Sequence, residues 1–173
     1  SCPNGCRKSH SSCGNQIGAF GVFCQLQRGI FGHSQAMNAH ILIVEDEFLV
    51  AANLEAMIED LGYAVIGVAP DAATALTLAD AGPDVALVDV NLADGPSGAQ
   101  VGAMLSRLGT AVVYLTANPA MLGDGVPGTV GVIAKPCDGQ TLEAAIAYAV
   151  DHRNGLRRKP PAKLTTFANT PGA

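Results

Sequence analysis

An uninterrupted apolar run that leads into three consecutive carboxylates constrains the fold of this chain more than any other stretch. The run is Ile41–Val44, and Glu45, Asp46 and Glu47 follow it. A short apolar run without polar alternation indicates a strand that is buried on both faces of a parallel sheet. The acidic residues would lie at the carboxyl end of that strand, where open α/β sheets bind ligands. They form either a solvated turn that opens the next helix or a site for a hard cation.

The same alternation of an apolar run with a helical pattern continues along the chain. Short apolar runs predict further buried strands at 64–69, 85–88, 111–115 and 132–134. Apolar residues at helical spacing predict helices at 48–61, 71–78, 97–108 and 142–150, and the first of these has Phe48 and Leu49 on its apolar face. The glycine-rich stretch 118–131 leaves room only for a short helix near 119–122. We therefore expect an α/β fold, a doubly wound five-stranded parallel sheet of order 2-1-3-4-5 with a reduced fourth helix.

The distribution of charge excludes one class of partner. All 15 acidic residues of the chain lie between Glu45 and Asp151, and the segment 41–154 contains only three basic residues. Nucleic-acid binding requires clustered lysine and arginine, so an acidic body of this kind argues against it. We expect protein partners, and neither nucleic acid nor a membrane.

The two ends of the chain differ from this acidic body. Residues 1–38 hold four of the five cysteines and no acidic residue, and Met37 stands where a natural start would fall. The cysteine spacings do not match a common zinc finger, and the segment lacks the cleavage pattern of a secretory signal. We interpret 1–38 as a non-native or disordered extension, 39–153 as the folded domain, and the Pro-rich basic stretch 154–173 as a disordered tail.

Polar residues follow the strands that meet at one crevice of the predicted sheet. Asp89 ends the third strand, Thr116 ends the fourth and Lys135 follows the fifth. In a sheet of order 2-1-3-4-5 the carboxyl ends of these strands converge with the end of the first strand, which carries Glu45 and Asp46. The second strand, which is remote from the crevice, ends without such a group.

These groups predict phosphoryl chemistry. Glu45, Asp46 and Asp89 together can hold Mg²⁺, and the carboxylate of Asp89 can attack phosphorus to form an aspartyl phosphate. Lys135 would stabilise charge on the phosphoryl oxygens, and the hydroxyl of Thr116 would hydrogen-bond one of them. Lys135 also has a purely structural interpretation, as the ion-pair partner of a buried Asp89.

Over about 39–153 the chain resembles the response-regulator receiver domain of bacterial two-component signalling. The motifs that carry the resemblance are Ile41–Asp46, Asp89, Thr116-Ala117 and Lys135-Pro136. The resemblance implies a flavodoxin-like fold and phosphotransfer from a histidine kinase or a histidine phosphotransfer protein onto Asp89. It also implies Mg²⁺ bound by Asp46 and Asp89, with Glu45 acting directly or through water.

The same resemblance supplies further expectations. The backbone carbonyl of Asn91 would complete the metal site, and the Lys135-Pro136 peptide would be cis. The protein would be cytoplasmic and would not be an enzyme, apart from assisting its own phosphorylation and dephosphorylation. The chain departs from the family at Val132, where an aromatic residue is common, and at Ala93, where proline is common. Tyr114 is the candidate substitute for the missing aromatic residue.

We expect a stand-alone receiver that signals to an unknown downstream protein through protein contacts. Two alternatives remain. One is a pseudo-receiver, a binding module that is never phosphorylated. The other is a phosphatase with an aspartyl nucleophile; such enzymes usually carry a second aspartate two residues after the nucleophile, where this chain has Asn91.

Overall fold

The computed structural model describes residues 38–93, 95 and 97–168, and within them a six-stranded sheet has the order β2-β1-β3-β4-β5-β6. The strands are β1 (His40–Val44), β2 (Ala64–Ala69), β3 (Val85–Asp89), β4 (Ala111–Thr116), β5 (Gly131–Ala134) and β6 (Thr165–Thr166). Neighbouring strands from β2 to β5 are parallel. The predicted five-stranded parallel sheet of order 2-1-3-4-5 is therefore confirmed.

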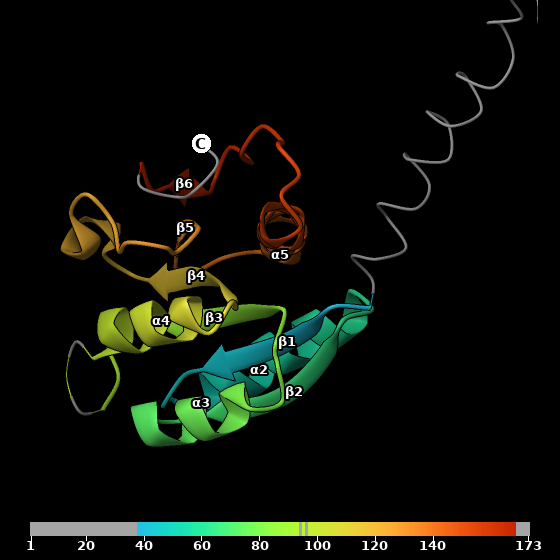
Figure 1. Cartoon of the computed structure of the whole chain (residues 1–173). Helices are drawn as coiled ribbons and strands as arrows, with labels where there is room; N and C mark the ends of the chain where they lie inside the picture. Colours follow the sequence, from blue (N-terminus) through green and yellow to red (C-terminus); the bar gives the residue numbers. More distant parts are fainter. Residues whose placement is uncertain (1–37, 94, 96, 169–173) are drawn as a thin grey trace, which may run out of the picture. The chain divides into compact units, whose positions relative to one another are not determined.

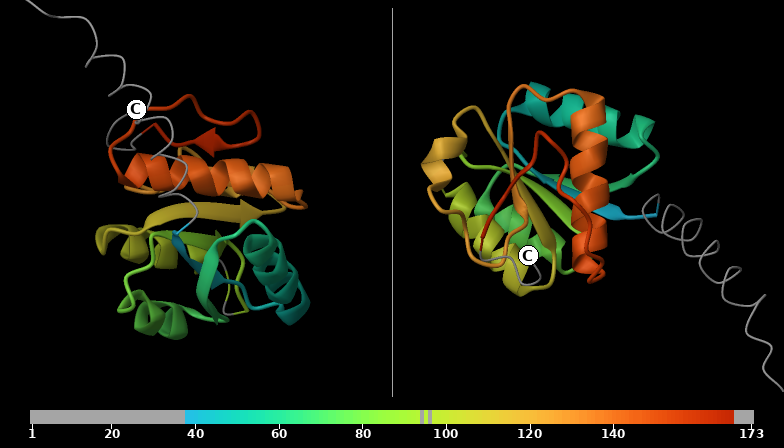
Figure 2. Two further views of the ribbon diagram at one scale, coloured as in Figure 1. Left: turned by 90° about the vertical axis from the view of Figure 1, so that its right-hand side faces the viewer. Right: turned by 90° about the horizontal axis from the view of Figure 1, so that it is seen from above.

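Helices cover both faces of the sheet (Figures 1 and 2). They are α2 (Phe48–Asp60), α3 (Ala72–Ala79), α4 (Gly98–Arg107) and α5 (Gly139–Arg153), with a 3-10 helix η1 (Pro119–Leu122) between β4 and β5. Helices α2 and α5 pack on one face, and α3 and α4 pack on the other. The reduced fourth helix that the glycine-rich stretch predicts is confirmed, because four residues of 3-10 helix stand in its place.

Two apolar cores form because successive strand residues point to opposite faces of the sheet. Ile41 and Ile43 of β1 belong to the core under α2 and α5. Leu42 and Val44 belong to the core under α3 and α4. All four side chains are fully buried, and burial of each stabilises the fold by roughly 1.5–3 kcal/mol. A strand buried on both faces is what the apolar run at 41–44 predicts.

Aspartate caps fix the starts of two helices. The carboxylate of Asp71 accepts a hydrogen bond from the backbone N–H of Thr74 at 2.8 Å, directly before α3. Asp138 accepts one from the N–H of Thr141 at 2.7 Å, directly before α5. Each cap satisfies a backbone donor that the helix itself leaves unpaired. The second cap also fixes where the chain turns after Lys135.

The placement of Phe48 and Leu49 on a buried helix face was wrong. Their exposed fractions are 79% and 74%, whereas Ala51, Leu54 and Ile58 form the buried face of α2. The helix starts at the carboxyl edge of the sheet, so its first turn has no strand surface beneath it. Two large apolar side chains are consequently exposed next to the polar residues at that edge.

The prediction of a disordered tail at 154–173 was also wrong for the part that the structure describes. Residues 165–166 form β6, which pairs antiparallel with Gly131 and Val132 of β5. Leu164 and Phe167, on either side of β6, are buried. The apolar area of these two side chains and the unpaired edge of β5 outweigh the polar, Pro-rich composition around them.

The interpretation of 1–38 as an extension lies outside the described residues, except for Asn38. Among the helices that the structure describes, we find none with the length and apolar character needed to cross a bilayer.

Candidate functional site

Lys135 connects two carboxylates that come from different strands. Its Nζ donates hydrogen bonds to Oε2 of Glu45 at 2.6 Å and to Oδ2 of Asp89 at 2.7 Å. Glu45 follows β1, Asp89 ends β3, and Lys135 follows β5. The convergence of these strand ends, which the sheet order predicts, therefore occurs. The Lys135-Pro136 peptide is cis, as the resemblance implies.

The cluster is largely shielded from water. The exposed fractions of the side chains are 3% for Glu45, 12% for Asp89 and 22% for Lys135. Burial raises the pKa of Glu45, although Lys135 opposes the shift. Burial acts to lower the pKa of Lys135, but its hydrogen bonds to Asp89 and Glu45 outweigh that effect and raise the pKa. Lys135 is therefore a fixed positive charge beside the acids.

Asp46 completes a group of three carboxylates. Glu45, Asp46 and Asp89 each offer one oxygen, and these oxygens all lie within 4.8 Å of one another. Carboxylate oxygens at this spacing are suitable ligands for a hard divalent cation. Three carboxylates with one ammonium leave two negative charges without compensation in the cluster. The chemistry of the donor set therefore fits a divalent ion.

Asn91 lies beside the cluster through its backbone. Its N–H donates to Oδ1 of Asp89 at 3.1 Å, so each carboxylate oxygen of Asp89 has a donor, the second being Lys135. This contact orients the carboxylate at the end of β3. The use of the Asn91 carbonyl as a metal ligand stays a prediction.

Thr116 ends β4 at the same edge and is fully buried. Its Oγ1 accepts a hydrogen bond from the N–H of Asn118 at 3.2 Å. Its carbonyl accepts one from the N–H of Lys135 at 2.8 Å. The backbone therefore connects the end of β4 to the start of the Lys135 loop, and any role of the hydroxyl in binding a phosphoryl group stays a prediction.

Gly98 is a site residue that sequence reasoning missed. It is the first residue of α4, and a Cβ added to it would lie 1.8 Å from the carbonyl oxygen of Asp89. Its N–H donates to the carbonyl of Val90 at 3.2 Å. The start of α4 is thus in direct contact with the backbone of Asp89. A glycine directly after the Pro96-Ser97 pair that precedes a helix was the available signal.

Tyr114 is buried two residues before Thr116 on β4. Its hydroxyl donates to the carbonyl of Ala99 in α4 at 3.0 Å. A Cβ on Gly102 would lie 2.1 Å from that hydroxyl, so the absence of a side chain there makes room for the tyrosine. Burial raises the pKa of Tyr114, and the residue stays protonated as a donor. Tyr114 is thus a fixed contact between β4 and α4.

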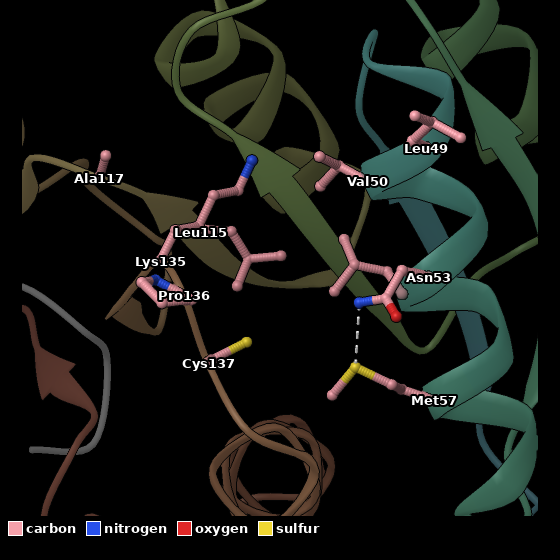
Figure 3. Close-up of a pocket in the computed structure, with 10 residues that line it drawn as sticks. Leu49, Val50, Asn53, Met57, Leu115, Ala117, Lys135, Pro136 and Cys137 are labelled. Atoms are coloured by element: carbon pink, nitrogen blue, oxygen red, sulfur yellow. Dashed lines mark hydrogen bonds between the residues drawn. The ribbon is translucent and has the colours of Figure 1, made fainter.

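A cavity of about 460 Å³ opens beside Lys135 (Figure 3). It lies between α2 and the ends of β4 and β5, and most of its lining is apolar. The lining residues are Leu49, Val50, Asn53, Leu54, Met57, Leu115, Ala117, Lys135, Pro136 and Cys137. Asn53 donates to the sulfur of Met57 at 3.4 Å across one wall. Exposed Leu49 stands at the helical side of this cavity, so an apolar surface adjoins the acidic cluster.

Comparison with known proteins gives one family and several relatives. The family model of the response regulator receiver domain matches residues 41–147. The phyllosphere-induced regulator PhyR of Methylorubrum extorquens is 38% identical over 127 residues, which are 71% of this chain and 48% of that protein. The chain therefore spans about half the length of this curated relative.

Solved structures show the same fold. The signal receiver domain of a modulated diguanylate cyclase from Desulfovibrio desulfuricans G20 is 30% identical, with a TM-score of 0.58 over 68% of this chain and 97% of that one. The anti-anti-sigma factor PhyR from Bartonella quintana is 27% identical, with a TM-score of 0.63 over 76% of this chain and 55% of that one.

Proposed function

Because the chain belongs to the receiver-domain family of response regulators, whose members are signalling proteins rather than classical enzymes, we propose that it accepts a phosphoryl group on Asp89. The donor is a histidine kinase or a histidine phosphotransfer protein, and the reaction takes place in the cytoplasm. Phosphorylation then changes the contacts that the domain makes with a downstream protein.

One observation carries this proposal. Nζ of Lys135 lies 2.7 Å from Oδ2 of Asp89 and 2.6 Å from Oε2 of Glu45. Asp46 adds a third carboxylate to the same cluster. A pseudo-receiver that is never phosphorylated does not need all three carboxylates and the lysine in one cluster. A buried ion pair alone would be satisfied by one acid, whereas this lysine faces two.

The proposed step is a displacement at phosphorus. A carboxylate oxygen of Asp89 forms a bond to phosphorus as the bond to the donor's imidazole nitrogen breaks, and the imidazole keeps the electron pair. Lys135 moves part of its hydrogen bonding from the carboxylates to a phosphoryl oxygen. The N–H of Asn91, which now faces Oδ1 of Asp89, keeps the carboxylate oriented during attack.

Glu45, Asp46 and Asp89 would hold Mg²⁺, together with the carbonyl of Asn91. Bound Mg²⁺ supplies positive charge that offsets the acids and the phosphoryl oxygens. Burial is the main cause of the raised pKa of Glu45, and the charge of Asp89 adds to it; a bound cation would favour the ionised form.

Thr116 would change its hydrogen bonding when Asp89 is phosphorylated, and so transmit the change to the rest of the domain. Its Oγ1 accepts from Asn118, so its own O–H hydrogen can donate to a phosphoryl oxygen. Its position at the end of β4 couples such a hydrogen bond to the loop that leads into η1.

The phosphodonor protein would dock over the first turn of α2 and the cavity beside Lys135. Phe48 and Leu49 are exposed there, and Leu49 lines the cavity. Clusters of exposed apolar side chains rimmed by polar groups mark protein-binding surfaces. The phosphohistidine of a protein bound at this surface would lie close to Asp89.

The downstream partner would belong to a pathway of sigma-factor control. A relative from Bartonella quintana is described as an anti-anti-sigma factor PhyR, and the chain is 38% identical over 127 residues to the regulator PhyR of Methylorubrum extorquens. Binding of the phosphorylated and unphosphorylated chain to purified anti-sigma factors would test this assignment, which fails if phosphorylation changes none of the affinities.

The phosphorylation itself is tested by incubation with acetyl phosphate and Mg²⁺, followed by intact-mass spectrometry. We expect the wild type to gain the mass of one phosphoryl group, and Asp89→Asn to gain none. Asp124→Asn, at an exposed aspartate outside the cluster, is the matched control and should label like the wild type. Labelling of Asp89→Asn would show that the phosphoacceptor is assigned wrongly.

A further inference from the structure

The end of the described chain returns to the sheet as a strand. After α5, residues 154–164 lead back across the domain, and β6 lies along the edge of β5 (Figures 1 and 2). The pairing is antiparallel and covers two residue pairs, Gly131 with Thr166 and Val132 with Thr165. One further hydrogen bond runs from the N–H of Phe167 to the carbonyl of Val130 at 3.3 Å. The edge of β5 is therefore occupied by the chain itself.

Gly125 and Gly131 leave room for this segment, and we call these two positions together the seat of the segment. A Cβ on Gly125 would lie 2.2 Å from the ring of Phe167, and a Cβ on Gly131 would lie 2.4 Å from the carbonyl oxygen of Thr165. Any side chain at either glycine would block the segment. Phe167 packs in the core under α3 and α4, and Leu164 packs in the core under α2 and α5. The segment thus anchors one residue on each side of the sheet edge.

The contacts outside this seat are exposed. Nζ of Lys163 forms an ion pair with Oδ2 of Asp138 at 2.8 Å, and the two side chains are 66% and 57% exposed. Exposed ion pairs add little stability, although this one holds the pKa of Asp138 below its usual range, together with the hydrogen bonds from Thr141. The two residue pairs between β5 and β6 are fewer than the five between β3 and β4 or the four between β4 and β5. A segment held in this way opens more readily than the strands of the core.

Tyr114 connects this segment to the phosphoacceptor site. The rings of Tyr114 and Phe167 are in contact, with centroids 6.3 Å apart. The same tyrosine donates to Ala99 at the start of α4, the helix that abuts the backbone of Asp89 through Gly98. Tyr114 and Thr116 are two residues apart on β4, so their side chains point to the same face of the sheet. A movement of Thr116 or of α4 would therefore move the side chain of Tyr114, which contacts Phe167.

We propose that the edge of β5 is a strand-docking surface, occupied at rest by the chain's own segment Leu164–Phe167, and that phosphorylation of Asp89 releases this segment. Release leaves the edge of β5 open to an extended segment of a partner protein. The seat selects a partner segment with an aliphatic residue and an aromatic residue three positions apart. A basic residue before them would replace Lys163 opposite Asp138. The release step rests on the proposed phosphorylation of Asp89.

Hydrogen–deuterium exchange of the backbone N–H groups of residues 164–168 measures release in the full chain. We expect acetyl phosphate with Mg²⁺ to speed this exchange several-fold in the wild type and to leave the rate unchanged in Asp89→Asn. Intact masses from the same samples report phosphorylation separately. Phosphorylated protein with an unchanged exchange rate would overturn the release proposal and leave the proposed function standing. Absence of phosphorylation would overturn both.

A synthetic peptide of residues 161–168 with a fluorescent label tests the docking surface without phosphorylation. We expect this peptide to bind the variants Phe167→Ala and Lys163→Glu more tightly than the wild type. Phe167→Ala removes one buried apolar side chain of the resident segment, and Lys163→Glu places a like charge beside Asp138. Lys163→Glu changes an exposed residue and leaves the core intact. The matched control Leu156→Ala alters another apolar residue of the same tail, which is 50% exposed, and should bind like the wild type. Equal binding to all four proteins would overturn the docking surface.

Discussion

Lys135 and Asp89 lie 46 residues apart in the chain, and their charged groups meet at 2.7 Å. The same ammonium reaches Glu45, 90 residues away. The contact exists because β1, β3, β4 and β5 end at one edge of the sheet. It places a fixed positive charge where the proposed phosphoryl group would be bound.

Replacement of Lys135 by methionine should destabilise the domain and slow its labelling. Glu45 and Asp89 would be left facing each other in a shielded site, and we expect the free energy of unfolding to fall by about 1–3 kcal/mol in Mg²⁺-free buffer. Urea denaturation measures the loss, and acetyl phosphate labelling measures the rate. Lys159→Met, at an exposed lysine of the tail, is the control. Equal stability of the two variants would mean that the Lys135 pairs contribute nothing.

Replacement of Asp46 by asparagine should weaken Mg²⁺ binding. The variant loses one of the three clustered carboxylates, and we expect the dissociation constant to rise by about tenfold or more. Isothermal titration calorimetry measures the change. Glu47→Gln removes the neighbouring exposed carboxylate, which is not part of that cluster, and should bind Mg²⁺ like the wild type. A similar loss in both variants would show that net charge, rather than a site, governs binding.

Replacement of Leu49 by serine should separate docking from chemistry. The variant removes an exposed apolar side chain beside the cavity, and we expect phosphotransfer from a phosphorylated histidine phosphotransfer protein to slow by about tenfold. Labelling by acetyl phosphate should stay unchanged, since no docking is involved. Leu108→Ser changes a leucine that is 64% exposed at the end of α4 and should affect neither rate. Equal slowing of both reactions would place Leu49 in the chemistry instead.

Replacement of Gly98 by alanine should cost stability. The added Cβ would overlap the carbonyl of Asp89, so the start of α4 must move, at a cost of about 1–3 kcal/mol. Gly139→Ala is a matched control, because Gly139 is also the first residue of a helix and its Cβ would meet only Met57 at 4.0 Å. Thermal unfolding of the two variants provides the comparison. A stable Gly98→Ala would mean that α4 is free to shift.

His152 should make stability depend on pH. Within the described residues its Nε2 is a buried nitrogen that lacks a hydrogen-bond partner, and burial lowers its pKa. The unfolded chain then binds a proton at a higher pH than the folded chain. The contribution to stability is full above the ordinary histidine pKa of about 6.5 and falls as the pH drops through the lowered value. Urea denaturation between these limits should show a smaller loss in His152→Gln than in the wild type, and equal losses would contradict this account.

Much of the fold and most of the site follow from local patterns in the sequence. The apolar runs predict all five parallel strands, because a strand buried on both faces has no polar position. The run at 64–69 is correct as a strand but wrong as a buried one, since β2 lies at the edge of the sheet and only Ala69 of it is buried. The position of a polar residue directly after such a run then locates Glu45, Asp89 and Lys135 at one edge. Their proximity follows from the order of the strands, and the topology rules for parallel sheets supply that order.

Features that depend on contacts between distant segments were not predicted. The seat of the tail is formed by the absence of side chains at Gly125 and Gly131, and two glycines in a glycine-rich stretch carry no pattern of their own. Exposure of Phe48 depends on where α2 starts relative to the edge of the sheet. The role of Gly98 depends on how closely one helix approaches one carbonyl.

The short strand β6 also has a consequence for how the protein behaves in a crowded solution. An open sheet edge is a template on which strands of other molecules can add, and this is a common start of aggregation. In this chain, residues attached to the domain itself protect the edge of β5. Because the protecting residues belong to the same chain, the protection of the resting protein does not depend on its concentration.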